Sequence, residues 1–255
     1  MSRLLEGKVI SVTGAGTGIG EGSALVLARE GATLILSDID REAVEETAQR
    51  VLQAGGKAIA VRTDVSDAAQ VQALVDLAVK QFGRLDGAFN NAGIVGPSVP
   101  MIDYPDADFD KVQSTDLRSV WLCMKAQIRQ MLKQHGGGAI LNTASVGGLV
   151  GKPAISAYIA AKHGVIGLTK TAALEYGSQG VRINAVCLGV IRTPMLDALI
   201  KGGQMGTEAQ WAAIQPIGRL GTTEEIGELA AWVLSDRASL LHGQSIAMDG
   251  GFTVS

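Results

Sequence analysis

The chain has 255 residues, of which 47% are hydrophobic and 18% charged, a composition that excludes intrinsic disorder. Its 22 Lys and Arg residues against 25 Asp and Glu include no sustained basic run, so we expect no nucleic-acid partner. The longest uncharged stretch, residues 134–151, is too rich in glycine and polar residues for a membrane span, so we expect no membrane partner. Cys123 and Cys187 match no metal spacing, so we expect no metal. We expect both thiols to be buried and the protein to be cytoplasmic.

Short β-branched runs alternate with amphipathic stretches along the whole chain. Helices are predicted between the runs, and residues 67–82 show the clearest helical period, with Ser66 or Asp67 as the N-cap. The alternation predicts a single domain, residues 1–255, with a doubly wound parallel α/β sheet (Rossmann fold) and helices on both faces. The predicted strands are residues 9–13, 33–37, 58–62, 87–90, 139–143, 182–187 and 245–248.

A glycine-rich loop follows the first predicted strand and leads directly into a helix over residues 21–30. It reads Thr13-Gly14-Ala15-Gly16-Thr17-Gly18-Ile19-Gly20. Glycines let the backbone approach a pyrophosphate closely, and a helix N-terminus offers free N–H groups and the positive end of its dipole. The strand, turn and helix in this order predict a dinucleotide phosphate site.

An acidic residue, Asp38, closes the second predicted strand. It follows Gly20 at close to the ~20-residue spacing expected for a carboxylate that accepts hydrogen bonds from a ribose 2′-hydroxyl. The same carboxylate would repel a 2′-phosphate, and Thr17 brings no positive charge to the loop. The sequence therefore favours NAD over NADP, although Arg41 lies nearby.

Three side chains in the second half of the chain predict proton transfer. Ser145 follows the fifth predicted strand, and Tyr158 and Lys162 lie on one face of the helix predicted over residues 154–176. A phenol is a poor base near neutral pH unless its anion is stabilised, and a nearby ammonium group supplies that stabilisation. Tyr158 is therefore expected to exchange a proton with an alcohol.

Together these residues resemble the short-chain dehydrogenase/reductase family, and the resemblance extends from the glycine loop to Asp249-Gly250-Gly251. The combination in this order is far more specific than any one motif. The matched motifs are Thr13-Gly14-x-x-x-Gly18-x-Gly20, Asp64 after the third strand, Asn90-Asn91-Ala92-Gly93, Ser145, Tyr158-x-x-x-Lys162, Asn184 and Thr193.

The resemblance implies that Tyr158 is the acid/base and that Ser145 orients and polarises the substrate oxygen. It implies that Lys162 holds the nicotinamide ribose and favours the phenolate of Tyr158. At the adenosine half of the cofactor it implies Gly14, Thr17, Gly18, Ile19 and Gly20 at the phosphates, Asp38 at the ribose, Asp64 and Val65 beside the adenine, and Asn90 at the adenine-side ribose. At the nicotinamide half it implies Asn91, Ala92 and Gly93 near the ring, and residues 190–193, with Ile191 and Thr193, at the carboxamide.

One catalytic position departs from the family pattern. Where the family's catalytic tetrad commonly has Asn, this chain has Asp116. In the family the main-chain carbonyl here holds a water that leads from the lysine, and Asp116 keeps that carbonyl if the helix keeps its local bend. An ionised Asp116 near Lys162 would partly cancel the lysine's field at Tyr158, so we expect alcohol oxidation to reach its plateau at higher pH than in an Asp116→Asn variant.

The substrate is expected between the nicotinamide and three mostly apolar segments, residues 94–104, 146–155 and 195–216. These segments favour a neutral, largely apolar secondary alcohol or ketone, including cyclic ones, while Arg192 leaves an anionic group open. The glycine pair Gly202-Gly203, followed by Met205-Gly206, predicts a mobile substrate loop around residues 190–216.

The sequence thus predicts an NAD-dependent alcohol dehydrogenase or ketone reductase. One alternative is an NADP-dependent 3-oxoacyl-type reductase, which tighter binding of the 2′-phosphorylated cofactor would favour. Another is a non-catalytic dinucleotide-binding protein, which Asp116 would favour and cofactor turnover would exclude.

Self-association is expected as well. The stretches 106–134 and 154–176 hold more apolar positions than one sheet face needs, and the resemblance implies dimers or tetramers built through these helices. We expect a homotetramer, with a homodimer as the alternative. The apolar residues assigned to this contact are Val120, Trp121, Met124, Ile128 and Met131.

Overall fold

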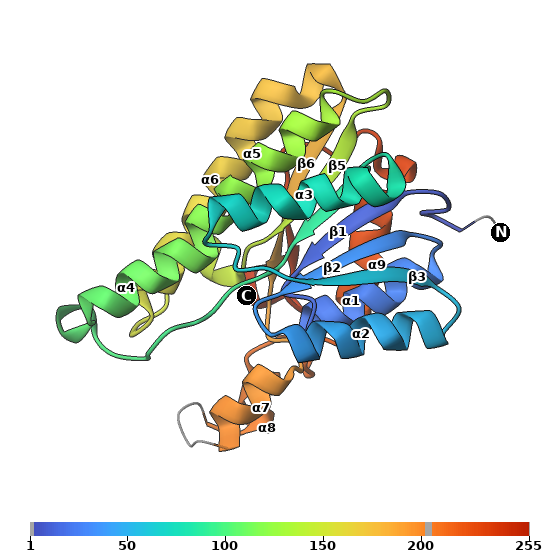
Figure 1. The fold of residues 1–255 in the computed structure, drawn as a ribbon. Coiled ribbons are helices and arrows are strands. Elements are labelled where there is room, and N and C mark those ends of the chain that lie inside the picture. The colour runs from blue at the N-terminus through green and yellow to red at the C-terminus, as the bar shows by residue number, and fades with distance from the viewer. Residues whose placement is uncertain (1–2, 202–205, 255) are drawn as a thin grey trace.

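A parallel sheet of seven strands runs through the centre of the molecule (Figure 1). The computed structural model describes residues 3–201 and 206–254. The strand order across the sheet is β3-β2-β1-β4-β5-β6-β7, the doubly wound arrangement that the alternation predicted. The strands are β1 (Val9–Thr13), β2 (Thr33–Asp38), β3 (Lys57–Arg62), β4 (Gly87–Asn90), β5 (Gly138–Thr143), β6 (Val181–Leu188) and β7 (Ser245–Met248).

Different helices cover the two faces of the sheet (Figure 1). Side chains alternate along each strand, so Leu34 and Leu36 of β2 belong to one buried core and Ile35 to the other. The first core lies under α1 (Gly18–Arg29), α2 (Arg41–Gln53) and α9 (Thr223–Leu234), and the second under α3 (Ala68–Phe82), α5 (Ser119–Met131) and α6 (Ser156–Tyr176).

Helix α3 shows how the local sequence sets the bounds of an element. The side chain of Asp67 accepts hydrogen bonds from the N–H groups of Ala69 and Gln70, so Asp67 and not Ser66 is the N-cap. The helix ends at Gly83, whose φ of 77° is readily adopted only by glycine.

The helix expected over residues 106–134 is divided in three. It consists of α4 (Asp106–Val112), a π-helical turn (Gln113–Arg118) and α5. Residues 190–216 include α7 (Pro194–Lys201) and α8 (Glu208–Ala213), which lie together at the lower end of the molecule in Figure 1. The glycine pair Gly202-Gly203 and Met205 lie outside the described residues.

Helix α9, from the last quarter of the chain, packs closely against α1. A Cβ atom on Gly22 would overlap the side chain of Thr223, and one on Gly227 would lie 2.7 Å from Cγ2 of Val26. At the end of α1, Arg29 pairs with Glu224 at 2.9 Å and also with Glu228. Glycine on each helix is thus what lets the two backbones come so close.

The face of α5 that we assigned to subunit contact is largely buried within the chain. Val120, Met124, Ile128 and Met131 are each 5% exposed or less, because this face packs against the sheet and α3. The expectation that these four residues contact another subunit is therefore wrong. Trp121 alone of the set remains exposed, at 43%.

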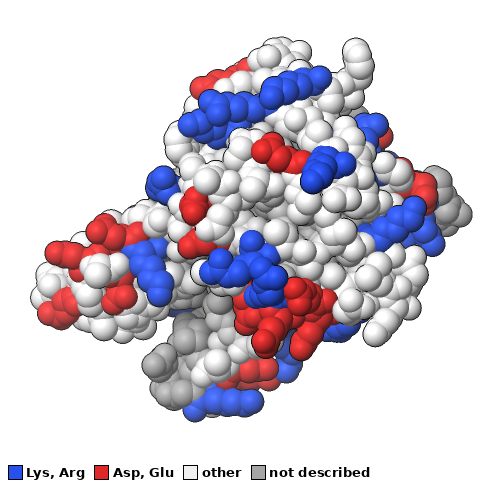
Figure 2. Space-filling view, viewed as in Figure 1, with Lys and Arg blue, Asp and Glu red and all other residues white. Residues whose placement is uncertain are grey.

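The surface and the thiols are ordinary for a globular chain. On the face shown in Figure 2, lysines and arginines are interspersed with aspartates and glutamates. Cys123 and Cys187 are both free and buried. Within residues 3–201 and 206–254, no helix combines the length and apolar character needed to cross a membrane.

Candidate active site

The site lies where the strand order reverses. Strand β1 pairs with β2 on one side and with β4 on the other, so the connections after these strands diverge and leave a crevice at their carboxyl ends. The glycine loop follows β1, Asn91 follows β4, and Ser145 comes shortly after β5.

The glycine loop is held close to the loop after β4. Gly14 has a φ of 64°, and a Cβ atom there would lie 2.8 Å from Cα of Ala92. A Cβ atom on Gly20 would overlap the carbonyl group of Gly14. Thr17, at the N-cap of α1, makes no side-chain capping hydrogen bond, so the first N–H groups of α1 lack the usual side-chain acceptor. Backbone donors at the start of α1 are therefore left without a side-chain partner, and the assignment of the loop to the cofactor phosphates stays a prediction.

Asn91 fastens the two loops together. Its side-chain amide donates to the carbonyl oxygens of Thr13 and Gly14 at 3.2 and 3.0 Å, while the hydroxyl of Thr13 accepts from the N–H groups of Asn91 and Ala92. The Asn91 side chain therefore positions the loop, a task that its motif alone did not reveal.

The carboxylate of Asp38 is fixed beside the glycine loop. Oδ2 accepts from the N–H of Gly16 at 2.9 Å and Oδ1 from the N–H of Asp40 at 3.0 Å. The side chain is half-buried, and each oxygen keeps acceptor capacity for a further donor. Arg41 is exposed at the start of α2.

Two other residues assigned to the adenine half are engaged within the protein. The carboxylate of Asp64 accepts from both the N–H and the hydroxyl of Ser66, at 2.9 and 2.7 Å. The side-chain amide of Asn90 is 2% exposed and exchanges hydrogen bonds with Gln127, while donating to Asn142. The side chain of Asn90 is thus occupied within the protein, and its assignment to the adenine-side ribose stays a prediction. Val65 is buried at 8% exposure, and its assignment stays a prediction.

The three expected catalytic side chains converge at the carboxyl end of β5. The hydroxyl of Ser145 accepts from the N–H of Gly147 at 3.1 Å, which leaves its own proton for another acceptor. Tyr158 is half-buried near the start of α6, and Nζ of Lys162 lies 5.4 Å from the centre of the Tyr158 ring. Lys162 is 3% exposed and donates to the carbonyl oxygen of Thr143 at 3.1 Å.

The π-helical turn brings Asp116 to the catalytic lysine. Asp116 is fully buried; Oδ1 accepts from the N–H of Ile94 at 2.8 Å, and Oδ2 lies 3.2 Å from Nζ of Lys162. A π-helical turn inserts one extra residue per turn, and such turns often occur at functional sites. The local bend that the resemblance required is therefore present, and it holds a carboxylate against the ammonium group.

This ion pair keeps Lys162 charged. Burial alone would lower the pKa of Lys162, but the negative charges of Asp116 and of ionised Tyr158 outweigh it and leave the pKa above its ordinary value. The lysine therefore remains protonated through the neutral range, and Asp116 supplies a counter-charge that an Asn would not.

A cavity of about 680 Å³ joins these groups. Thr17, Gly18, Ile19, Gly93, Ile191 and Thr193 line it together with Asp116, Ser145, Tyr158 and Lys162. Among the described residues, Asp38, Asp64, Val65 and Asn90 are not part of this lining, so the residues assigned to the adenine half lie outside it. The remaining wall is mostly apolar, as the sequence predicted, and includes Val95, Val146, Val150, Ile155, Met195, Leu196 and Ile214.

The wall also includes Lys152, Trp211 and Phe252, none of which was named individually from the sequence, although Lys152 and Trp211 lie within segments expected to meet the substrate. None stands in a motif, and each comes from a different segment, so only the folded structure brings them together. Arg192, which had left an anionic substrate open, instead pairs with Glu208 on the exposed surface and is not among the residues lining the cavity.

The chain is similar to known oxidoreductases over nearly its whole length. A family model described as enoyl-(acyl carrier protein) reductase matches residues 14–253. A cyclohexanol dehydrogenase of Acinetobacter sp. (strain SE19) is 42% identical over 253 residues, covering 99% of this chain and 98% of that protein. Among solved structures, levodione reductase matches with a TM-score of 0.94 at 40% identity, covering 98% of this chain and 99% of that one. An NAD⁺-bound xylitol dehydrogenase matches with a TM-score of 0.91 at 35% identity, covering 97% and 99%.

The arrangement is suited to moving one proton at an alcohol or carbonyl oxygen. A hydroxyl and a phenol flank one apolar cavity, with a charged ammonium group beneath them, next to a glycine loop at the switch point of the sheet. Fold, motifs and relatives agree, and the chain is an oxidoreductase that belongs to the short-chain dehydrogenase/reductase family.

Proposed function

We propose that the protein is an NAD-dependent dehydrogenase of cyclic secondary alcohols that also reduces the corresponding ketones. The observation that carries the proposal is the placement of Ser145, Tyr158 and Lys162 on one cavity whose remaining wall is mostly apolar. The size of about 680 Å³ leaves room for a ring beside a nicotinamide. The Acinetobacter relative is a cyclohexanol dehydrogenase, which supports a cyclic substrate.

The residues present fit a nicotinamide dinucleotide. Gly14 and Gly20 let the glycine loop fold closely against Ala92 and against the start of α1, where a Cβ atom would collide with the backbone, and the first N–H groups of α1 have no side-chain cap. Asp38 would bind the adenosine ribose, and Lys162 the nicotinamide ribose. When bound, the cofactor accepts or donates the hydride.

The protein's own part of the reaction is the proton. In oxidation, the hydroxyl of Ser145 donates to the substrate oxygen while the phenolate of Tyr158 takes the alcohol proton. Lys162 stabilises that phenolate through its charge, which Asp116 maintains. In the reverse direction Tyr158 returns the proton to the oxygen of the reduced ketone.

The direct test is a panel of cyclic and open-chain alcohols and ketones, with NAD(H) and NADP(H), followed by nicotinamide absorbance. We expect cyclohexanol to be oxidised faster with NAD than with NADP. Turnover excludes the non-catalytic alternative, whereas preference for NADP(H) and for 3-oxoacyl substrates would support the reductase alternative.

Cofactor choice is expected to depend on Asp38. In the Asp38→Ala variant the preference for NAD over NADP, measured as a ratio of kcat/KM values, should fall roughly tenfold to hundredfold, because the charged acceptor and its repulsion of a 2′-phosphate are both removed. The matched control is Asp40→Asn, which keeps the N-cap of α2 and should leave the ratio nearly unchanged. Equal use of both cofactors by the parent enzyme would refute the assignment.

We also propose a homotetramer, assembled partly through a groove between the α4–α5 segment and α6. Leu117, Trp121 and Leu168 line this groove together with Gly164 and Gly167. Gly164 is covered by Leu117, but a Cβ atom on Gly167 would meet nothing within 4 Å, so a second copy could approach closely there. Light scattering should give the mass of four chains for the parent and a smaller mass for Trp121→Glu. A stable parent monomer would contradict the proposal.

For the location of the protein we propose the cytoplasm, which the two free, buried cysteines favour.

A further inference from the structure

The charges that line the catalytic cavity do not balance. Three charged side chains contribute to its wall: Asp116, Lys152 and Lys162. Asp116 and Lys162 form a buried pair, with Oδ2 and Nζ 3.2 Å apart, so the charges of this pair compensate each other. Within residues 3–201 and 206–254, no carboxylate lies within ion-pair distance of Lys152. While Tyr158 is protonated, the cavity wall therefore carries one positive charge, that of Lys152, which no carboxylate compensates.

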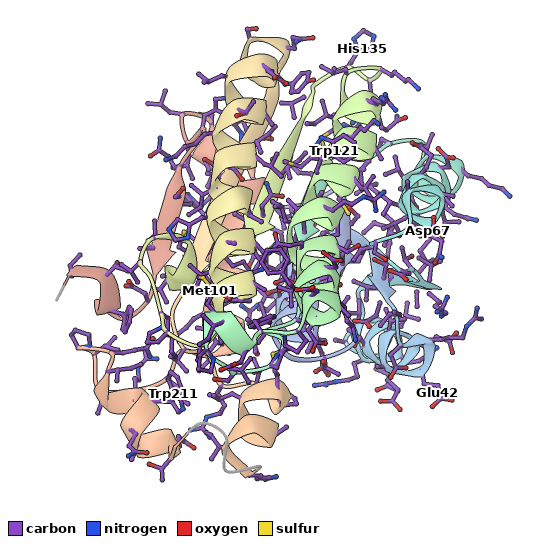
Figure 3. All side chains as sticks on the ribbon, turned by 90° about the vertical axis from the view of Figure 1, so that its left-hand side faces the viewer. Glu42, Asp67, Met101, Trp121, His135 and Trp211 are labelled. Atoms are coloured by element: carbon purple, nitrogen blue, oxygen red, sulfur yellow. The ribbon has the colours of Figure 1, made fainter. Side chains whose placement is uncertain are left out.

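Lys152 belongs to the loop between β5 and α6, and it meets α8 across the cavity. Its Nζ lies 4.1 Å from the centre of the Trp211 ring. In Figure 3 Trp211 lies in the α7–α8 layer, below the N-terminal end of α6, the helix that carries Tyr158. Lys152 lies at the exposed rim of the cavity. Partial burial of its ammonium group lowers the pKa of Lys152.

The indole ring fixes the ammonium group in place without neutralising it. An aromatic face attracts a cation through its quadrupole, but it accepts no full hydrogen bond and carries no net charge. An ammonium group has three N–H donors, and none of those on Lys152 donates to another described residue. The group is thus held at the cavity wall with its charge and its donors available.

We propose that Lys152 binds an anionic substituent of the substrate, so that the preferred substrates are alicyclic hydroxy acids and oxo acids that carry a carboxylate. The proposal rests on the proposed function, since the ring would occupy the apolar wall while the reacting oxygen meets Ser145 and Tyr158. Arg192, the cation that the sequence pointed to, is already paired with Glu208. Lys152, and not Arg192, is therefore the cation that would meet an anionic group of the substrate.

Binding of a ligand that cannot react tests the proposal without requiring turnover. Cyclohexanecarboxylate and its neutral isostere cyclohexanecarboxamide are titrated calorimetrically into the enzyme saturated with NAD, which blocks the phosphate site. We expect the parent to bind the carboxylate about tenfold more tightly than the amide. Lys152→Met should abolish this preference, Lys152→Arg should retain it, and Lys133→Met, which removes an exposed lysine outside the cavity wall, should leave it unchanged.

Cyclohexanol oxidation by the same four proteins separates this proposal from the proposed function. We expect Lys133→Met to oxidise cyclohexanol at a rate within twofold of the parent, and Lys152→Met to lose less cyclohexanol oxidation than carboxylate preference, because cyclohexanol has no group for Lys152 to bind. Equal affinity of the parent for carboxylate and amide, or a preference that survives in Lys152→Met, would overturn the proposal. So would a loss of cyclohexanol oxidation in Lys152→Met as large as the loss in carboxylate binding, since that would mean that Lys152 only supports the wall through Trp211. If the parent binds the carboxylate selectively but oxidises no cyclic alcohol, the proposed function fails and the anion site stands.

Discussion

Tyr158→Phe is expected to lower kcat by about 10²- to 10⁴-fold while cofactor affinity stays close to that of the parent. The substitution keeps the ring and its packing at the start of α6 and removes only the hydroxyl that carries the proton. Steady-state oxidation of cyclohexanol gives kcat, and fluorescence titration with NADH gives the affinity.

The matched control is Tyr176→Phe, at the far end of the same helix. This side chain packs against the core and lies outside the cavity lining, so its loss of a hydroxyl should change kcat by less than twofold. Near-parental turnover in Tyr158→Phe would show that another group transfers the proton.

Lys162→Met is expected to abolish most turnover and also to destabilise the fold by about 3–5 kcal/mol. The stability loss has a specific origin: Asp116 is fully buried, and without Lys162 its carboxylate has no opposite charge within reach. Chemical denaturation of the parent and the variant, extrapolated to water, measures the free energy of unfolding.

The double variant Lys162→Met/Asp116→Asn separates the two roles of the lysine. Removing both charges should restore most of the stability, because the amide oxygen of the introduced asparagine can still accept from the N–H of Ile94, while turnover should remain low. If the free energy of unfolding of Lys162→Met equalled that of the parent, Asp116 would not depend on Lys162 to remain ionised in the folded protein.

The single variant Asp116→Asn completes the comparison with Lys162→Met and the double variant, and it should still oxidise cyclohexanol. Loss of the carboxylate removes the charge that partly cancels the field of Lys162 at Tyr158, and it also removes one of the two negative charges that keep Lys162 protonated. Because the phenolate of Tyr158 still favours the charged lysine, kcat/KM for oxidation should reach its plateau at lower pH than in the parent. Coincident profiles would show that Asp116 is electrostatically silent. An inactive parent rescued by Asn would instead show a broken proton relay and favour a non-catalytic role.

Most of the fold follows from short-range patterns, and the exceptions have physical causes. The β-branched runs predicted the strands to within one or two residues because the central strands are buried on both faces of a parallel sheet, while the edge strands β3 and β7, only partly buried, keep the same apolar character. The π-helical turn at Gln113–Arg118 escaped prediction because one extra residue in a helix leaves the local apolar spacing nearly unchanged. The apolar surplus on α5 was assigned to a second subunit because nothing in its own sequence indicates that the sheet and α3 fill that face.

The candidate site likewise has parts that the sequence could predict and parts that it could not. Ser145, Tyr158 and Lys162 could be placed because they stand at fixed positions relative to a strand end and a helix turn. The contact of Lys152 with Trp211 could not, because it depends on how an irregular loop meets a short helix from a distant part of the chain. Nor does spacing show that Asp116 and Lys162 touch, since their pairing requires both the π-helical turn and the packing of α6 beside it.

Because α9 packs closely on α1, we expect the protein to become able to bind its cofactor only late in its synthesis. Helix α1 is made among the first thirty or so residues, yet it rests on Thr223–Leu234 through Gly22 and Gly227. At about 5–20 residues per second, roughly 10–40 s separate the two helices on the ribosome. A cofactor stabilises only a folded state that can bind it, so the growing chain gains nothing from the nucleotide until its last quarter has emerged. Loss of the C-terminal helix, as in a truncated translation product, would thus disable a nucleotide site whose glycine loop is intact.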